Sequence, residues 1–170
     1  MRIGRDVIVN VTSYNHWLGY KWVKSFFPDS EFHMVSIADN HIDGALICLN
    51  PGVFLVDPKY ANIKDLLPDK FKSWKMLIPR EEDLTKNIDV RGLSDIDIRL
   101  ASSRGMDINV LSIDEDTVVV YDRAVCVKQL LEENGFNVIS VPFDNGEIFA
   151  GGIHCSTLDL VREDEYIYYA

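Results

Sequence analysis

The chain has 170 residues, of which 47% are hydrophobic, enough for one domain with a packed core. Its 27 acidic and 17 basic residues give a formal net charge of −10, which argues against a nucleic-acid partner and favours a cationic small molecule. No apolar run approaches the roughly 20 residues that a membrane-spanning helix needs, so no membrane association is expected.

The first part of the chain predicts a strand, a helix and a second strand. Residues 6–11 alternate as a strand that opens with Asp6. Thr12 or Ser13 can cap the following helix. Large apolar side chains recur there near a 3.6-residue period: Tyr14, Trp17, Leu18, Trp22 and Phe26. Residues 32–37 then predict the second strand.

The middle of the chain predicts a hairpin, a helix and a returning strand. Residues 45–49 and 53–56 are expected to pair around the Asn-Pro-Gly turn at 50–52. A short helix near 60–67 and a strand at 74–78 follow. The order strand, strand, helix, strand is therefore complete in this part.

The same order recurs in the last third of the chain. Strands at 109–113 and 117–121 form a hairpin, and Asp122 can cap the helix that follows. Its buried side is expected to carry Val127, Leu130 and Leu131. The Asn-Gly pair at 134–135 ends the helix, and a strand at 136–141 returns. The first part of the chain matches this order without its first strand, so the architecture is predicted to be modular α/β.

The repeats divide the single domain into modules at about 1–43, 44–79 and 105–142, with a C-terminal segment at 143–170. Residues 80–99 lie between modules and carry ten charged side chains among twenty residues. This segment is either a solvated surface loop or a loop that overhangs a site.

The segment 151–157 reads Gly-Gly-Ile-His-Cys-Ser-Thr and is the most informative in the chain. A glycine pair lets the backbone turn and approach a ligand, and Cys155 directly after it can be presented as a nucleophile. The alternative is a small buried cysteine, as most free cysteines are. On strand-like alternation His154 faces away from Cys155 and is a framework residue.

The cysteine count bears on compartment and cofactors. Cys48, Cys126 and Cys155 are odd in number and lack metal-ligand spacing. A disulfide framework is therefore not expected, and a reducing cytoplasm is the expected location. Neither a metal nor another cofactor is expected.

His41 and Asp43 are two residues apart, so in an extended backbone they share one side. That layout suits an acid–base imidazole beside a carboxylate. The alternatives are a loop histidine with a capping aspartate, or a metal site, for which no further ligands stand at a recognisable spacing. Asp6 opens an otherwise apolar strand, where a carboxylate needs a partner such as histidine unless the strand start is exposed.

Together these segments resemble the glycine amidinotransferase family of the pentein superfamily. The stretches that carry the resemblance are, in chain order, Gly4-Arg5-Asp6-Val7-Ile8-Val9, Leu18-Gly19, His41-Ile42-Asp43, Pro51-Gly52, Ser102-Ser103, Asn109-Val110-Leu111 and Gly151-Gly152-Ile153-His154-Cys155. The resemblance implies a propeller of five ββαβ modules around a central active site. This chain corresponds to about three modules, the C-terminal half of a family member, so a homo-oligomer or a complementing chain is expected to complete it.

The resemblance also implies residue roles. Cys155 attacks the guanidinium carbon and forms an amidino-cysteine. His41 exchanges protons with the leaving and entering nitrogens, and Asp6 orients that imidazole. Asp43 grips the guanidinium, ideally through two parallel hydrogen bonds.

The resemblance places Ser102 or Ser103 near the acceptor site. The chain departs from the family at the substrate-carboxylate site. The family has an arginine where this chain has Tyr60. Lys59 beside it can substitute, as a point charge rather than a planar fork.

The implied function is transfer of an amidino group from L-arginine, or a related guanidine, to an amine acceptor. The first alternative is a guanidine hydrolase or deiminase, in which water resolves the same intermediate. The second is a non-catalytic protein that binds guanidines or a protein partner.

Overall fold

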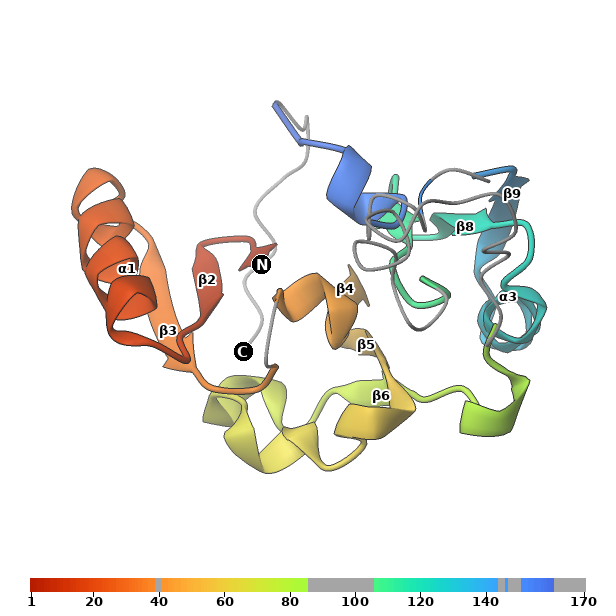
Figure 1. Cartoon of the computed structure of the whole chain (residues 1–170), viewed down its shortest axis with the longest axis horizontal. Coiled ribbons are helices and arrows are strands. Elements are labelled where there is room, and N and C mark those ends of the chain that lie inside the picture. Colours follow the sequence, from red (N-terminus) through yellow and green to blue (C-terminus); the bar gives the residue numbers. More distant parts are fainter. Residues whose placement is uncertain (39–40, 86–105, 144–145, 147–150, 161–170) are drawn as a thin grey trace, which may run out of the picture.

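The computed structural model describes residues 1–38, 41–85, 106–143, 146 and 151–160. Within them three sheets of three strands follow one another along the chain, each in sequential strand order (Figure 1). In every sheet the first two strands are antiparallel, and the third returns parallel to the second. The predicted modular α/β architecture is confirmed.

The first sheet contains the strand that the sequence pattern missed. Its elements are β1 (Arg2–Ile3), β2 (Asp6–Asn10), α1 (Tyr14–Phe26) and β3 (Glu31–Val35). β1 is only two residues long, too short to show alternation. The predicted cap is confirmed at Ser13, whose Oγ accepts the His16 N–H at 3.2 Å.

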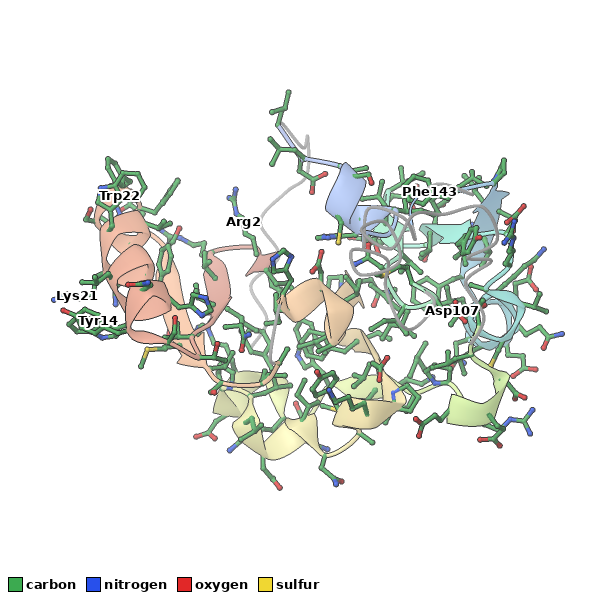
Figure 2. All side chains as sticks on the ribbon, in the orientation of Figure 1. Arg2, Tyr14, Lys21, Trp22, Asp107 and Phe143 are labelled. Atoms are coloured by element: carbon green, nitrogen blue, oxygen red, sulfur yellow. The ribbon has the colours of Figure 1, made fainter. Side chains whose placement is uncertain are left out.

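Helix α1 presents large apolar side chains to solvent. None of its residues is buried, and Tyr14, Trp22 and Phe26 are 70%, 66% and 61% exposed. Figure 2 shows Tyr14 and Trp22 on the outer side of the helix, away from the rest of the molecule. The periodicity therefore predicts the helix correctly, but in the described structure the apolar stripe does not face a core. Neither described helix combines the length and apolar character needed to span a bilayer.

The second sheet connects its last two strands through 3₁₀ turns. Its strands are β4 (Leu46–Asn50), β5 (Val53–Val56) and β6 (Lys75–Leu77), and its turns are η2 (Pro58–Tyr60), η3 (Ile63–Leu66) and η4 (Asp69–Phe71). Gly52 has φ 92°, a conformation that favours glycine in the tight turn between β4 and β5. The α-helix expected at 60–67 is wrong. Pro68, which lacks an N–H, stops helical continuation after η3.

The third sheet follows the predicted order closely. Its elements are β7 (Leu111–Ser112), β8 (Thr117–Tyr121), α3 (Val125–Glu133) and β9 (Asn137–Val141). Gly135, at φ 89°, follows the helix as expected. Asp122 does not cap it. Asp122 lies in a turn and donates its N–H to the Val141 carbonyl at 2.9 Å, while Ala124 occupies the cap position.

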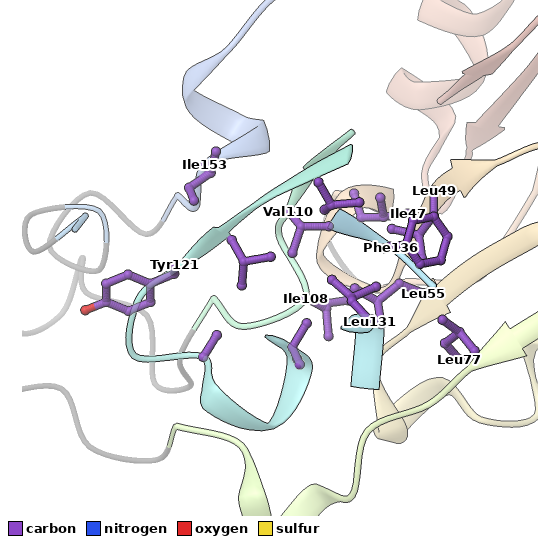
Figure 3. Close-up of a cluster of buried hydrophobic side chains, with 14 residues drawn as sticks. Ile47, Leu49, Leu55, Leu77, Ile108, Val110, Tyr121, Leu131, Phe136 and Ile153 are labelled. Atoms are coloured by element: carbon purple, nitrogen blue, oxygen red, sulfur yellow. The ribbon is translucent and has the colours of Figure 1, made fainter. Parts of the chain in front are cut away.

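Two hydrophobic clusters meet at the second sheet, because alternating residues of its strands face opposite sides. Ile47 and Leu55 belong to the cluster shared with the third sheet, which Figure 3 shows around Leu131. Leu46 and Phe54 belong to the other cluster, shared with the first sheet. The second sheet is thus buried on both faces and holds its neighbours in place.

Candidate active site

Two segments that are distant in sequence meet at one point. Asp43 lies on the 3₁₀ turn η1 (Ile42–Gly44), directly before β4. Cys155 lies on η6 (His154–Ser156), whose start is anchored by buried Ile153 in the cluster of Figure 3. The Cys155 thiol donates a hydrogen bond to Asp43 Oδ2 at 3.1 Å. Packing of the second sheet against the third thus joins residues 112 positions apart.

Cys155 is exposed. The alternative of a small cysteine buried among aliphatic side chains is therefore wrong. Its sulfur contacts a carboxylate on one side and the Asn109 side-chain amide on the other. A thiol set between polar groups at the surface can be reached by a substrate.

Asn109 is the site residue whose role the sequence reasoning missed. It is 2% exposed and lies just before β7. Its Oδ1 accepts the Cys155 backbone N–H at 3.0 Å, and its Nδ2 is 3.2 Å from both the Cys155 Sγ and the Asp43 carbonyl oxygen. The available signal was an asparagine at the start of an otherwise apolar strand, since a buried amide requires partners.

His154 does not face away from the site. Its Nδ1 lies 2.9 Å from Asp43 Oδ2, the oxygen that also accepts the Cys155 thiol. The expectation of a framework residue failed because residues 154–156 form a 3₁₀ turn, to which the two-residue alternation of a strand does not apply.

Asp43 and Cys155 shift each other's pKa in opposite directions. Burial alone raises the pKa of Asp43, but hydrogen bonds from His154 and Cys155 outweigh it and hold the pKa well below its usual range. Partial burial, and then the Asp43 carboxylate, raise the pKa of the Cys155 thiol. The resting site is therefore a thiol beside a carboxylate.

His41 and Asp6 are placed apart from the expected pairing. His41 is exposed at the start of η1, and within the described residues its ring has no hydrogen-bond partner. Asp6 instead binds His33 Nε2 at 2.5 Å and Lys70 Nζ at 2.6 Å. The expected Asp6–His41 pair is therefore not formed.

The sheet register explains the partner of Asp6. Strands β2 and β3 are parallel and place Asp6 opposite Glu31. His33, two residues further on, lies on the same face of the sheet as Asp6. Burial raises the pKa of Asp6, but hydrogen bonds from Lys70 and His33 lower it below its usual value.

The remaining predicted residues lie elsewhere or outside the described parts. Lys59 is exposed on η2, with its ammonium 5.1 Å from the centre of the Tyr60 ring. Ser102 and Ser103 lie outside the described residues, as does most of the segment 80–99.

One described cluster has the chemistry of a metal site. Ligand atoms of Asp6, Glu31 and His33 lie within 4.8 Å of one another. The ammonium of Lys70 is 2.6 Å from Asp6 and 3.1 Å from Glu31, so a cation already bridges the two carboxylates. We propose no metal there.

Comparison with known proteins finds that the chain is similar to an arginine deiminase family model and to several amidinotransferases. A family model described as arginine deiminase matches residues 99–162. Inosamine-phosphate amidinotransferase 1 of Streptomyces griseus is 29% identical over 165 residues, 95% of this chain and 45% of that protein. L-arginine:L-lysine amidinotransferase of Pseudomonas savastanoi pv. phaseolicola is 26% identical over 171 residues, 95% of this chain and 42% of that protein.

The structural comparison extends over the same region. A solved structure of inosamine-phosphate amidinotransferase from Streptomyces griseus superposes with a TM-score of 0.80 at 27% identity, over 99% of this chain and 47% of that one. The chain thus spans less than half the length of these relatives and has the fold of half an amidinotransferase. Over nearly its whole length the chain is therefore similar to the amidinotransferase family of the pentein superfamily.

Proposed function

We propose that this chain takes part in amidino transfer, with Cys155 accepting the amidino group of L-arginine or a related guanidine. The observation that carries the proposal is the 3.1 Å contact between the Cys155 Sγ and Asp43 Oδ2. It joins a nucleophile and an anionic binding group, the two functions that chemistry on a planar cation requires.

The proposed transfer has two half-reactions. The Cys155 sulfur forms a bond to the guanidinium carbon, and the bond from that carbon to the side-chain nitrogen of arginine breaks. The thiol proton is transferred to the departing nitrogen, so ornithine leaves as an amine and the amidino group stays on sulfur. An amine acceptor then forms a bond to the same carbon, the carbon–sulfur bond breaks, and a proton from the amine returns to the sulfur to restore the thiol. His41 is the proposed proton carrier for both steps.

The electrostatics of the site support a substrate-assisted attack. Asp43 raises the pKa of the Cys155 thiol while it is unpaired with a substrate. A guanidinium bound to Asp43 would neutralise that carboxylate and place a positive charge beside the sulfur. The thiolate would then form where its target is bound. Asp43 Oδ2 already accepts the Cys155 thiol and lies 2.9 Å from His154 Nδ1, so a guanidinium that binds both carboxylate oxygens must displace His154.

Hydrolysis is the second candidate, and one observation favours it. The arginine deiminase family model matches residues 99–162, which include both Asn109 and Cys155. Two hydrolytic routes are possible. If ornithine leaves first, water in place of an amine attacks the amidino-cysteine and releases urea. If ammonia leaves first, as in a deiminase, the sulfur-bound carbon still carries the ornithine nitrogen, and water releases citrulline.

The first half-reaction can be tested by intact mass spectrometry. The protein is incubated with L-arginine, and the expected result is a mass increase of one amidino group in place of one hydrogen, with release of ornithine. Cys155→Ala is expected to show neither, whereas Cys126→Ala, which removes a half-buried cysteine elsewhere, is expected to behave like the parent.

The outcomes separate the candidate functions. Repeated turnover, with more than one ornithine released per protein molecule, that requires an added amine supports transfer. Urea formed with ornithine, or citrulline formed with ammonia, in water alone supports hydrolysis. The absence of adduct, ornithine and citrulline across the pH range would contradict both catalytic proposals for this chain. Arginine binding without turnover would then support a guanidine-binding protein. A second, complementing chain or copy is proposed as the partner to add in a repeat of the test.

A further inference from the structure

Every polar group of the Asn109 side chain is used to join the two reactive segments. Oδ1 accepts the backbone N–H of Cys155 at 3.0 Å. A side-chain amide has two N–H donors, and Nδ2 directs them to the Cys155 Sγ and the Asp43 carbonyl oxygen, each at 3.2 Å. The backbone carbonyl oxygen of Asn109 also accepts the backbone N–H of His154 at 3.3 Å. We infer that Asn109 is a positioning residue that fixes the Cys155 sulfur beside Asp43 and stabilises its thiolate.

The geometry requires an asparagine specifically. An aspartate would accept the Cys155 N–H but has no donor for the sulfur when ionised, and an aliphatic side chain would do neither. The fit is close as well. A Cβ on Gly152 would lie 2.5 Å from both the Cβ and the Oδ1 of Asn109. Glycine at 152 therefore lets the nucleophile segment lie directly against this amide.

Asn109 and Asp43 have opposite effects on the pKa of the Cys155 thiol. The Asp43 carboxylate accepts the thiol hydrogen and opposes its loss. The Asn109 N–H points at the sulfur, and a hydrogen bond to an anion is roughly twice as strong as one between neutral groups. Loss of the proton thus strengthens the contact with Asn109. The inference rests on the proposed function only in taking this thiolate to be the reactive form.

The test measures the ionisation of Cys155 without requiring catalysis. The rate of Cys155 alkylation by iodoacetamide is followed against pH by peptide mass spectrometry, and its midpoint reports the thiol pKa. Asn109→Asp replaces a donor with a negative charge, and we expect the midpoint to rise by about one pH unit or more. Asn109→Ala removes the donor without adding charge, and we expect a smaller rise.

Asn10 provides a matched control. It also bridges two segments, accepting the Ile37 N–H at 2.9 Å and donating to the Ala38 carbonyl at 2.7 Å, and it makes no contact with Cys155. Asn10→Asp is expected to leave the Cys155 midpoint unchanged. An unchanged midpoint in both folded Asn109 variants, or an equal rise in Asn10→Asp, would overturn the inference.

A second measurement covers the case in which the Asn109 variants do not fold, which rapid alkylation of half-buried Cys48 and Cys126 would reveal. In the unaltered protein the ¹³Cγ resonance of Asn109, observed by carbon detection, should shift with the same midpoint as Cys155 alkylation. This shift should vanish in Cys155→Ala. A resonance that does not respond to the thiol would equally overturn the inference.

The two proposals fail separately. If L-arginine forms no adduct but the midpoint moves as expected, the positioning role stands and the proposed function fails. If the adduct forms and the midpoint does not move, the reverse holds.

Discussion

The carboxylate of Asp43 has two properties that matter for the site: its position beside Cys155 and its lowered pKa. It lies beside the candidate nucleophile, and hydrogen bonds from His154 and Cys155 keep its pKa low enough for it to stay ionised. A permanent negative charge suits a group that recognises a guanidinium ion. The same charge suppresses formation of the thiolate in the empty site. Under the proposed function, this pairing predicts that Cys155 reacts chiefly when a guanidinium is bound to Asp43.

Asp43→Asn tests this antagonism. Asparagine keeps the shape of the side chain but removes the charge, so the pKa of Cys155 should fall, because a thiolate no longer faces an anion. We expect the midpoint of Cys155 alkylation by iodoacetamide to drop by about one pH unit. Asp114→Asn, which removes one charge from an exposed turn, should leave it unchanged. A midpoint that stays or rises in Asp43→Asn would contradict the electrostatic account.

Sequence reasoning at this scale identified residue types better than residue contacts. It placed Cys155 and Asp43 in one site, and the structure brings their side chains together. It assigned Asp6 to His41, but strand register gives Asp6 to His33. The register between two strands depends on long-range packing, and an alternating pattern within one strand does not specify it. His154 was misplaced for a local reason, since its 3₁₀ turn carries no pattern of its own.

Secondary structure elements with strong local signals were predicted well. Ser13 marks the start of α1, and glycines in the left-handed region mark the β4–β5 turn and the end of α3. Elements whose structure depends on the packing around them were not predicted. Strand β1 is two residues long, and η2 to η4 replace the expected helix. Such short pieces are held by the packing around them rather than by their own periodicity.

The two described α-helices have similar apolar periodicity but different roles in the core. Leu131 of α3 is fully buried, whereas Leu18 of α1 is 45% exposed. Leu131→Ala should therefore lower the free energy of unfolding by about 2–5 kcal/mol, through lost burial and a cavity. Leu18→Ala should change it by about 0.5 kcal/mol or less.

Urea unfolding of the two variants compares one side chain in two settings. Because both changes are Leu→Ala in helices, differences in helix propensity cancel. Equal losses would contradict the burial of α3, or would show that the exposed stripe of α1 packs against something in solution.

At the scale of the whole molecule, the three sheets confirm the repeated modules expected from the sequence. The sequence pattern did not predict how the modules pack against one another to share a core. The second sheet is buried on both faces because β4 and β5 send alternate side chains into two clusters. That sharing places η1 next to η6, and so positions the candidate site. The site is therefore a property of module packing rather than of any one module.

Global stability should depend on pH through carboxylates in two of these modules. Asp6 and Asp43 have lowered folded-state pKa values, so each stabilises the fold when ionised above its unfolded pKa. That contribution is lost as the pH falls from about 5 through the folded values. Asp107 is buried with a raised pKa and acts in the opposite sense, since its burial costs least when it is protonated. We expect the effect of Asp6 and Asp43 to exceed that of Asp107. The free energy of unfolding should therefore fall by about 2 kcal/mol or more by about pH 2.

Urea midpoints measured from neutral to acid pH check this expectation. The double variant Asp6→Asn, Asp43→Asn should be less stable at neutral pH and should show a flatter profile, because the groups that bind protons on unfolding are gone. Asp107→Asn should instead steepen the acid loss, since it stabilises the neutral-pH protein and leaves the acid form nearly unchanged. A parent protein whose stability rises on acidification would mean that burial of Asp107 outweighs the hydrogen bonds that hold Asp6 and Asp43 ionised.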